Sequence, residues 1–249
     1  MLHTFEKRAQ AVVVTLPAYT IGKALGVEEG MRELARQIEN PDAKSLPAVR
    51  TIARLRTLCD LTLRIDTGGT QLPHVRSRHA HDAWELGAEV WFSVDDDNEA
   101  TTDTLRDMLE AVRGDTPRIV IAPYIIRGAP TQGGTLVTVC VELPRIITSE
   151  RRLPNGARLR PITKGGFGLI AINRAALAAV REQCAHLVYL DHDDVERLAL
   201  FHAEIVDRRW LSDDFAFFSH VPPHVQIEAL LTGHTVHAGE ALNLAEVES

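Results

Sequence analysis

The amino-acid sequence predicts an α/β fold, in which one mostly parallel sheet carries helices on both faces. Short β-branched apolar runs alternate with amphipathic stretches through the first 125 residues, a pattern typical of parallel strands joined by crossover helices. The chain has 249 residues, 45% hydrophobic and 24% charged, so it can bury a full core without a disulfide or structural metal. No internal repeat or linker divides it, and we expect a single domain over residues 1–249.

Each expected element follows from a local pattern. The run AVVVTL stops at Pro17, which is typical of a buried strand. The next apolar stripe has helical spacing and stops at Asn40-Pro41, which ends a helix. The same reasoning predicts strands at residues 11–16, 61–65, 90–94, 118–126, 135–142 and 186–191, and helices at residues 27–38, 45–58, 73–86, 105–112 and 195–206.

Charge and cysteine content narrow the functional classes. Lys and Arg number 27 against 34 Asp and Glu, and the net charge of −7 argues against a dedicated nucleic-acid binder. Cys59, Cys140 and Cys184 are far apart, match no zinc spacing and indicate a reduced, cytoplasmic protein. No apolar run is long enough to cross a bilayer, so we expect no stable membrane insertion.

The most informative segment is VWFSVDDDN, in which a buried strand runs directly into Asp95, Asp96 and Asp97. Adjacent carboxylates repel one another and resist desolvation, so a buried strand does not normally end in three of them. Alternation along a strand would place Asp95 and Asp97 on one side and Asp96 on the other. Two carboxylates on one side suit Mn²⁺ or Mg²⁺, which would in turn hold a pyrophosphate. The alternative is a solvated acidic loop that caps the next helix.

Six motifs follow one another along the chain: VVVTLPAY, IDTGGT, the Arg-bearing segment VRSRHAHDA, the acidic strand end SVDDDN, the glycine-containing KGGFGLIAINRAAL and the acidic pair of LSDDFAFF. In the order of these motifs, the chain resembles, over about residues 11–240, a nucleotide-sugar glycosyltransferase of the GT-A fold, closest to the family-2 type, in which SVDDDN is the DXD strand. The resemblance implies a metal-dependent, inverting transfer of a sugar from a nucleotide diphosphate, a UDP-sugar first of all, to an acceptor hydroxyl. It implies a nucleotide-binding half at about residues 11–125 and an acceptor and catalytic half at about 126–245.

The resemblance also implies a role for each matched residue of the donor site. Asp66 would contact the base or ribose, and Arg78 would help to hold the nucleotide. Asp95 would bond the donor ribose or sugar, and Asp97, with Asp95, would ligate the metal. Thr15, Pro17 and Tyr19 would line the base pocket, Asp96 would add a substrate contact, and Gly165 and Gly166 would form a close-approach loop beside the donor sugar.

Asp214, preceded by Asp213, stands at the position of the family's catalytic base. As the resemblance implies, it would take the proton of the acceptor hydroxyl while that oxygen attacks the anomeric carbon, and the metal would stabilise the departing diphosphate. His237 is the candidate for a further metal ligand, although the family's histidine usually lies several residues later, near Asn243. The acidic pair also has a purely structural interpretation, because Ser212 can cap a helix whose first turn favours carboxylates.

Three other interpretations stay open. A nucleotidyltransferase or nucleotide-sugar pyrophosphorylase has a related sheet, but LPAYTIGK offers only one Gly and one Lys after the first strand. An NAD-dependent Rossmann enzyme would use Gly166 to Ala171 as its G-x-G-x-x-A fingerprint, with Asp191 about 20 residues further on. A non-catalytic nucleotide-sugar-binding protein would keep the sheet with a degenerate site.

Two charged segments lie outside these motifs. Residues 145–164, the basic arm, hold six Lys and Arg against one Glu, and Pro154-Asn155-Gly156 predicts a hairpin turn within them. The arm would either balance nearby acids or bind an anionic acceptor, which would be a phosphorylated lipid, an acidic glycan or, less readily, a nucleic acid. Asp191-His192-Asp193-Asp194 has metal-binding residue types, but we expect a solvated turn before the helix at residues 195–206.

Overall fold

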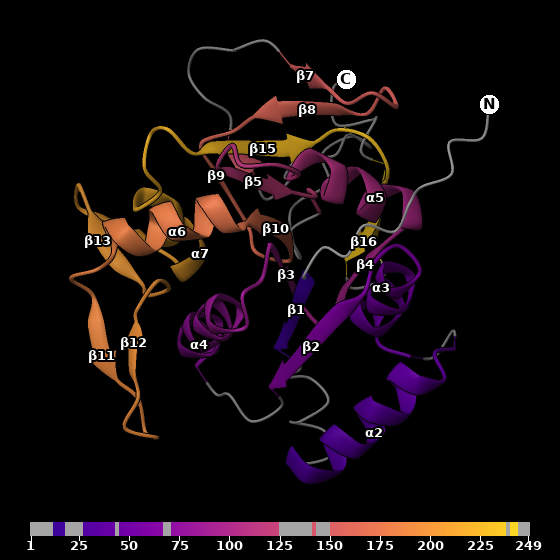
Figure 1. Ribbon diagram of the computed structural model, residues 1–249, viewed down its shortest axis with the longest axis horizontal. Helices are drawn as coiled ribbons and strands as arrows, with labels where there is room; N and C mark the ends of the chain where they lie inside the picture. The colour runs from indigo at the N-terminus through magenta and orange to yellow at the C-terminus, as the bar shows by residue number, and fades with distance from the viewer. Residues whose placement is uncertain are drawn as a thin grey trace.

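The computed structural model describes residues 12–17, 27–42, 45–66, 71–124, 141–142, 150–237 and 240–243. An eight-stranded sheet forms the centre of the molecule (Figure 1). From one edge to the other its strands are β2 (Leu61–Asp66), β1 (Val12–Pro17), β3 (Val90–Val94), β10 (Leu169–Asn173), β5 (Arg118–Ile121), β15 (Gln226–Leu230), β8 (Arg158–Pro161) and β7 (Arg151–Arg152). Strands β10 and β8 run against the other six, and all of the antiparallel pairing in this sheet involves them.

The three parallel strands β2, β1 and β3 set the position of the site. Every residue of β1 is buried, as its β-branched apolar sequence predicts. In the register, Pro17 of β1 lies beside Asp66 of β2, and Thr15 lies beside Ser93 of β3. Because parallel strands end at the same edge, Pro17, Asp66 and Val94 lie together at one edge of the sheet.

Helices cover both faces of the sheet, which confirms the predicted α/β class. Alternate residues of β1 explain the two layers, because Val12 and Val14 belong to one apolar cluster and Val13 to the other. Figure 1 shows the two groups of helices on opposite sides of the sheet. On the first face lie α2 (Val27–Glu39), α3 (Pro47–Arg56) and α5 (Thr102–Ala111); on the second lie α4 (Leu72–Glu85), α6 (Arg174–Gln183) and α7 (Asp213–Ser219).

Short strands outside the central sheet complete the described structure. No helix of the described residues is long and apolar enough to cross a membrane. Residues 125–140 lie outside the described part, and with them most of the strand expected at residues 135–142. The short pairings join β11 (Val188–Leu190) to β12 (Glu196–Leu198), β13 (Glu204–Val206) to β14 (Arg209–Leu211), β6 (Val141–Glu142) to β9 (Lys164–Gly165), and β16 (His234–His237) to both β17 (Glu240–Asn243) and β4 (Asn98–Ala100).

The helix predicted at residues 195–206 is wrong, because this segment contains strands β12 and β13. Between those strands Phe201 inserts into an aromatic cluster on the second face of the sheet. Its ring lies 4.6 Å from that of Phe167 and is stacked at 4.8 Å on that of Phe217. The apolar residues of this segment are spaced as in a helix, but they belong to two separate hairpins, β11–β12 and β13–β14.

The structure also excludes the dinucleotide-binding interpretation. A fingerprint of that type follows a strand and opens a helix, so that the pyrophosphate meets the helix N-terminus. Here Gly166 and Gly168 precede β10, a strand that is antiparallel to both of its neighbours. Gly168 is required for another reason: a Cβ atom there would lie 2.5 Å from Cε1 of Tyr124 and 2.7 Å from Nδ2 of Asn98.

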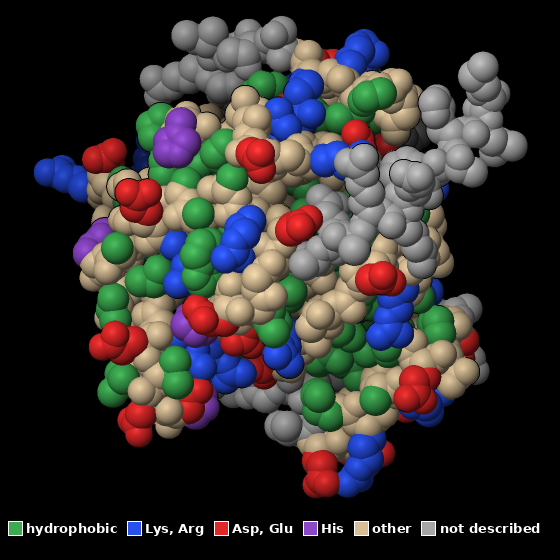
Figure 2. Space-filling view, viewed as in Figure 1, with side chains coloured by type: hydrophobic (Ala, Val, Ile, Leu, Met, Phe, Trp, Pro, Cys, Tyr) green, Lys and Arg blue, Asp and Glu red, His purple; other side chains and the backbone are tan. Residues whose placement is uncertain are grey.

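The basic arm contains the β7–β8 hairpin at one edge of the central sheet, with the predicted turn at Pro154 to Gly156. Arg151 donates to both carboxylate oxygens of Glu228 at 2.9 and 2.6 Å, and Arg160 donates to Glu150 at 2.8 Å. Figure 2 shows acidic and basic side chains interspersed on the visible face. The arm thus balances nearby acids, and its role toward an anionic or nucleic-acid acceptor stays a prediction.

Candidate functional site

The buried guanidinium of Arg76, on α4, gathers three carboxylates at the strand-end edge of the sheet. It donates to both oxygens of Asp95 at 3.1 and 2.9 Å and to Asp213 at 3.0 Å, and it also bonds Asp214. Asp95 follows β3, whereas Asp213 and Asp214 form the first turn of α7. The structure therefore joins the predicted DXD carboxylate to the predicted catalytic pair, although 118 positions separate Asp95 from Asp213. We call these four residues the Arg76 cluster.

Helical spacing explains why Arg76 is inside the protein. Helix α4 begins beside Pro73, and its buried residues include Arg76, Ala80 and Ala83, which follow one another at i, i+4 and i+7. Only 3% of the Arg76 side chain is exposed, and the guanidinium lies 5.5 Å from the centre of the Phe167 ring. The sequence prediction singled out Arg78 and missed Arg76; the apolar spacing of the alanines was the signal that could have found it.

The acidic segment after β3 is a turn and not a continued strand. The strand ends at Val94, and the N–H of Asn98 donates to the carbonyl of Asp95 at 3.0 Å. The predicted alternation of Asp95, Asp96 and Asp97 therefore does not apply. Asp97 accepts from the side chain of Asn98 at 3.1 Å, and the N–H of Asp95 donates to the Gly168 carbonyl at 2.9 Å. Asp96 is buried, and its carbonyl accepts from the N–H of Ala48 on α3.

The acidic pair is held at the start of α7 by contacts with the glycine-containing segment. Ser212 occupies the N-cap position as predicted, but its side chain makes no capping hydrogen bond. The N–H of Phe167 donates to Asp214 at 3.3 Å, directly after Gly165 and Gly166. Both glycines are buried. The segment KGGFG thus lies against the first turn of α7, and its contact with a donor sugar stays a prediction.

The cluster has more negative than positive charge, and this shifts the pKa of its carboxyl groups. Burial raises the pKa of Asp95 to about 6; Arg76 opposes this, while the charges of Asp214 and Asp97 add to it. Burial also raises the pKa of Asp214, again against Arg76 and with the Asp213 charge. For Arg76 burial lowers the pKa, but the three carboxylates outweigh it and the net direction is upward. One cation shared by three acids leaves an excess of negative charge at this edge.

The predicted base-pocket residues form a separate group at the same edge. Arg78 donates to Asp66 at 2.7 Å, and Asp66 lies beside Pro17 in the register of β1 and β2. Thr15 lies two residues before Pro17 and is fully buried, with its hydroxyl donating to the Phe92 carbonyl and accepting from Trp91 Nε1. Tyr19 lies outside the described residues. The structure thus brings Pro17, Asp66 and Arg78 together, and it places Thr15 in the core of the sheet.

The backbone places His237 close to the acidic turn. In the pairing of β16 with β4, His237 lies opposite Asn98, the residue that follows Asp97. Its side chain lies outside the described part of the structure. The register is compatible with the predicted role of His237 as a metal ligand, and that role stays a prediction.

A groove of about 510 Å³ lies beside α7. Phe215 and Phe218 of α7 contribute to its lining, and the Lys164 ammonium sits 5.2 Å from the centre of the Phe215 ring. Residues of the β13–β14 hairpin also line it, including Val206, Arg209 and Leu211. Because Phe215 follows Asp214 directly, the groove begins next to the predicted base.

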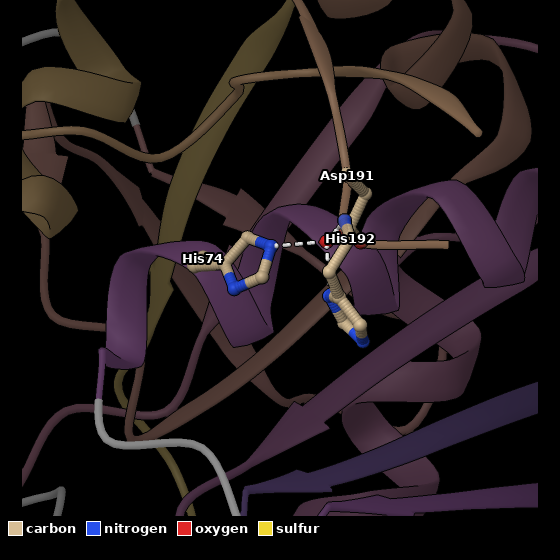
Figure 3. Close-up of side chains that lie close together, drawn as sticks. All are labelled: His74, Asp191 and His192. Carbon is tan, nitrogen blue, oxygen red and sulfur yellow. Dashed lines mark hydrogen bonds and ion pairs between the residues drawn. The ribbon is translucent and has the colours of Figure 1, made fainter. Parts of the chain in front are cut away.

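The run that begins at Asp191 forms a turn that is exposed from His192 to Asp194, as the sequence predicts, but Asp191 itself is buried. One oxygen of Asp191 lies 3.0 Å from His74 Nε2 and 2.6 Å from His192 Nδ1. Figure 3 shows both histidines directed toward this carboxylate. Its second oxygen lies 2.6 Å from a guanidinium nitrogen of Arg197. Asp193, in the exposed turn, pairs with the same arginine. The carboxylate of Asp191 therefore has partners on both oxygens.

Comparison with known proteins gives similarity of fold alone. No protein-family model matches the sequence, and no curated protein sequence matches it. Among solved structures, A197 from STIV has a TM-score of 0.51 at 12% identity over 95% of this chain and 92% of its own. S. aureus TarS 1-349 in complex with UDP-GlcNAc has a TM-score of 0.40 at 13% identity, over 89% of this chain and 56% of its own. Mannose-1-phosphate geranyltransferase from Thermus thermophilus has a TM-score of 0.35 at 11% identity, over 90% of this chain and 74% of its own.

Proposed function

We propose that the protein is a metal-dependent, inverting glycosyltransferase of the GT-A type that uses a nucleoside diphosphate sugar, a UDP-sugar first of all. The observation that carries this proposal is the Arg76 cluster, which brings Asp95 and Asp214 to one guanidinium from two distant parts of the chain. In the resemblance these residues are the donor-binding carboxylate and the catalytic base. Their convergence is what a single displacement at one sugar carbon needs.

The residues at the acidic turn fit a hard divalent cation. Asp97 and Asp95 offer carboxylate oxygens, the ligands that Mn²⁺ and Mg²⁺ prefer. The charge of Asp97 contributes to the raised pKa of Asp95, so the two groups are near enough to interact. His237 would add a nitrogen ligand from β16, across the register from Asn98. When bound, the cation would supply positive charge for the diphosphate that leaves.

Asp214 is suited to hold the acceptor proton. Its side chain is 20% exposed, so solvent and substrates can reach it, and burial raises its pKa toward the range of an effective general base. Arg76 and the Phe167 N–H fix its two oxygens. The apolar and aromatic side chains of the groove beside α7 would exclude water and position the acceptor hydroxyl.

Calorimetric titration with UDP, with and without Mn²⁺, tests the donor site. Asp97→Ala is expected to abolish the cation-dependent part of UDP binding, and Asp214→Asn is expected to bind UDP as the wild type does. Asp103→Ala is the matched control, because that carboxylate is 79% exposed on α5 and pairs with Arg106 of the same helix. If Asp97→Ala and Asp103→Ala bind equally well, the assignment of the cation site is refuted.

Turnover with a panel of UDP-sugars tests the reaction. Loss of the base is expected to slow transfer about 10²–10⁴-fold in Asp214→Asn, while donor binding is retained. Wild-type rates in this variant would refute the role of Asp214. Formation of UTP and a sugar 1-phosphate from a UDP-sugar and added pyrophosphate would identify a nucleotidyltransferase. Donor binding without any turnover would identify a nucleotide-sugar-binding protein.

A further inference from the structure

We propose a second metal site, formed by His202, Glu204 and His220, that binds a transition-metal dication such as Zn²⁺. His202 lies between β12 and β13, Glu204 is the first residue of β13, and His220 is the C-cap of α7. The site is chemically distinct from the carboxylate-rich turn. It also does not rest on the proposed sugar transfer, because metal binding is measured without a donor.

The spacing of the three side chains suits tetrahedral zinc. Glu204 Oε2 lies 3.3 Å from His220 Nε2 and 3.7 Å from His202 Nε2. The three ligand atoms all lie within 4.8 Å of one another. Zinc bonds nitrogen and carboxylate oxygen at about 2.0–2.2 Å, so ligand atoms in a tetrahedral site are roughly 3.4 Å apart. The observed distances therefore need only small rotations to meet at one ion.

The hydrogen bonds around the cluster leave the metal-binding atoms available. His202 Nδ1 lies 3.0 Å from the Ala199 carbonyl, so this nitrogen donates and Nε2 keeps its lone pair toward Glu204. His220 Nε2 is buried and has no hydrogen-bond partner among the described residues. The Ser219 hydroxyl lies 2.5 Å from the other oxygen of Glu204 and 2.6 Å from the Ala216 carbonyl. When its one hydrogen is donated to Glu204, it fixes the carboxylate as outer partners fix metal ligands.

Residue chemistry favours zinc over the cations expected at the acidic turn. Imidazole nitrogens suit Zn²⁺ and its transition-metal neighbours, whereas carboxylate and water oxygens suit Mg²⁺ and Mn²⁺. Two histidines and one glutamate leave a fourth position open, as in many zinc sites that also hold a water molecule. Bound metal would tie the start of β13 to the end of α7, and Val206 and Ser219 on these segments line the groove.

The cluster of His74, Asp191 and His192 in Figure 3 is the natural comparison, and its charge argues against a cation. A guanidinium nitrogen of Arg197 lies 2.6 Å from Asp191 and would repel a dication there. The His192 side chain is also 70% exposed, so its position is not fixed by packing. His74 and His192 therefore provide matched control substitutions.

Equilibrium dialysis of the full chain against Zn²⁺, after treatment with a chelator, tests the proposal. The wild type is expected to bind one zinc ion that is lost in His202→Ala and His220→Ala and retained in His74→Ala and His192→Ala. Ser219→Ala is expected to weaken binding roughly 10–100-fold, the effect of losing an outer partner. Bound Co²⁺ is expected to give the intense visible absorption of a tetrahedral site in the wild type and in His192→Ala.

Circular dichroism of each variant separates loss of the site from loss of the fold, and His220→Gln preserves side-chain volume if His220→Ala does not fold. Folded His202→Ala and His220→Gln that still bind zinc as the wild type does would overturn the proposal. No zinc binding by the wild type would overturn it as well, and the cluster would then be two histidine–carboxylate pairs.

Discussion

Replacing Arg76 with Leu is expected to destabilise the fold by about 3–5 kcal/mol at pH 8, the cost of removing one partner from a buried ion pair. The side chain is 3% exposed, whereas its three carboxylate partners are 18–22% exposed, so they cannot be fully solvated when the guanidinium is lost. The expected loss therefore comes from the carboxylates that remain without their cation.

The same substitution carries a pH dependence with a definite sign. Burial already raises the pKa of Asp95 to about 6, and without Arg76 the folded-state pKa rises further above its unfolded value of about 3.9. A carboxyl group of this kind destabilises the fold above its folded pKa, and the effect disappears below its unfolded pKa. Arg76→Leu is therefore expected to cost less at pH 5 than at pH 8.

Urea unfolding followed by circular dichroism at both pH values measures these differences. Arg78→Leu is the matched control on the same helix, because Arg78 is 30% exposed and its pair with Asp66 is expected to contribute less than about 1 kcal/mol. Arg76→Lys keeps the charge and is expected to recover part of the loss. A cost for Arg76→Leu no greater than that of Arg78→Leu, or one independent of pH, would refute the reasoning.

Three further predictions concern the same edge and the core beneath it. Because Asp95 has a pKa of about 6, affinity for Mn²⁺ is expected to fall about tenfold per pH unit below pH 6, which calorimetry at pH 5 and 7.5 would measure; a flat profile would exclude Asp95 as a ligand. Gly168→Ala is expected to destabilise by about 1–3 kcal/mol in urea unfolding, since its Cβ would lie 2.5 Å from Tyr124. Asn173→Ala is expected to cost about 2–4 kcal/mol, because this buried side chain caps α6 and its two N–H groups are shared among three loop carbonyls; an unchanged midpoint would contradict both stability predictions.

The sequence predicts those parts of the fold in which a local pattern and the tertiary structure agree. The buried strand at residues 12–17 and the helix at residues 72–85 are predicted to within one or two residues, since apolar spacing and proline fix their limits. The prediction for residues 195–206 is wrong because Phe201 packs against Phe167 and Phe217, which are distant in the sequence. The spacing of apolar residues along the chain does not reveal contacts of this kind. The sequence predicts the edge of the sheet at which the parallel strands end. It does not predict the turn at Asp95 to Asp97, because this turn depends on the hydrogen bond from the Asp95 N–H to the Gly168 carbonyl.

The ion-pair partners of a charged side chain are harder to predict from the sequence than its position on a helix. Arg76 and Arg78 are two residues apart on one helix, yet one is buried among three acids and the other pairs with Asp66 near the surface. Only the spacing of Arg76 with Ala80 and Ala83 distinguishes them in the sequence. A charged residue is expensive to bury, so an arginine at an apolar position of a helix indicates that carboxylates from elsewhere in the chain pair with it in the core.

The distribution of charge indicates how a protein of net charge −7 would hold the proposed polyanionic donor. Within the basic arm, Arg151 and Arg160 pair with Glu228 and Glu150, so these two charges are balanced inside the protein. Negative charge is left in excess where β3 ends, with one guanidinium for three carboxylates. A site of that sign repels a diphosphate unless a cation lies between them. The same excess that costs stability in the free protein is thus what would make donor binding depend on a divalent metal.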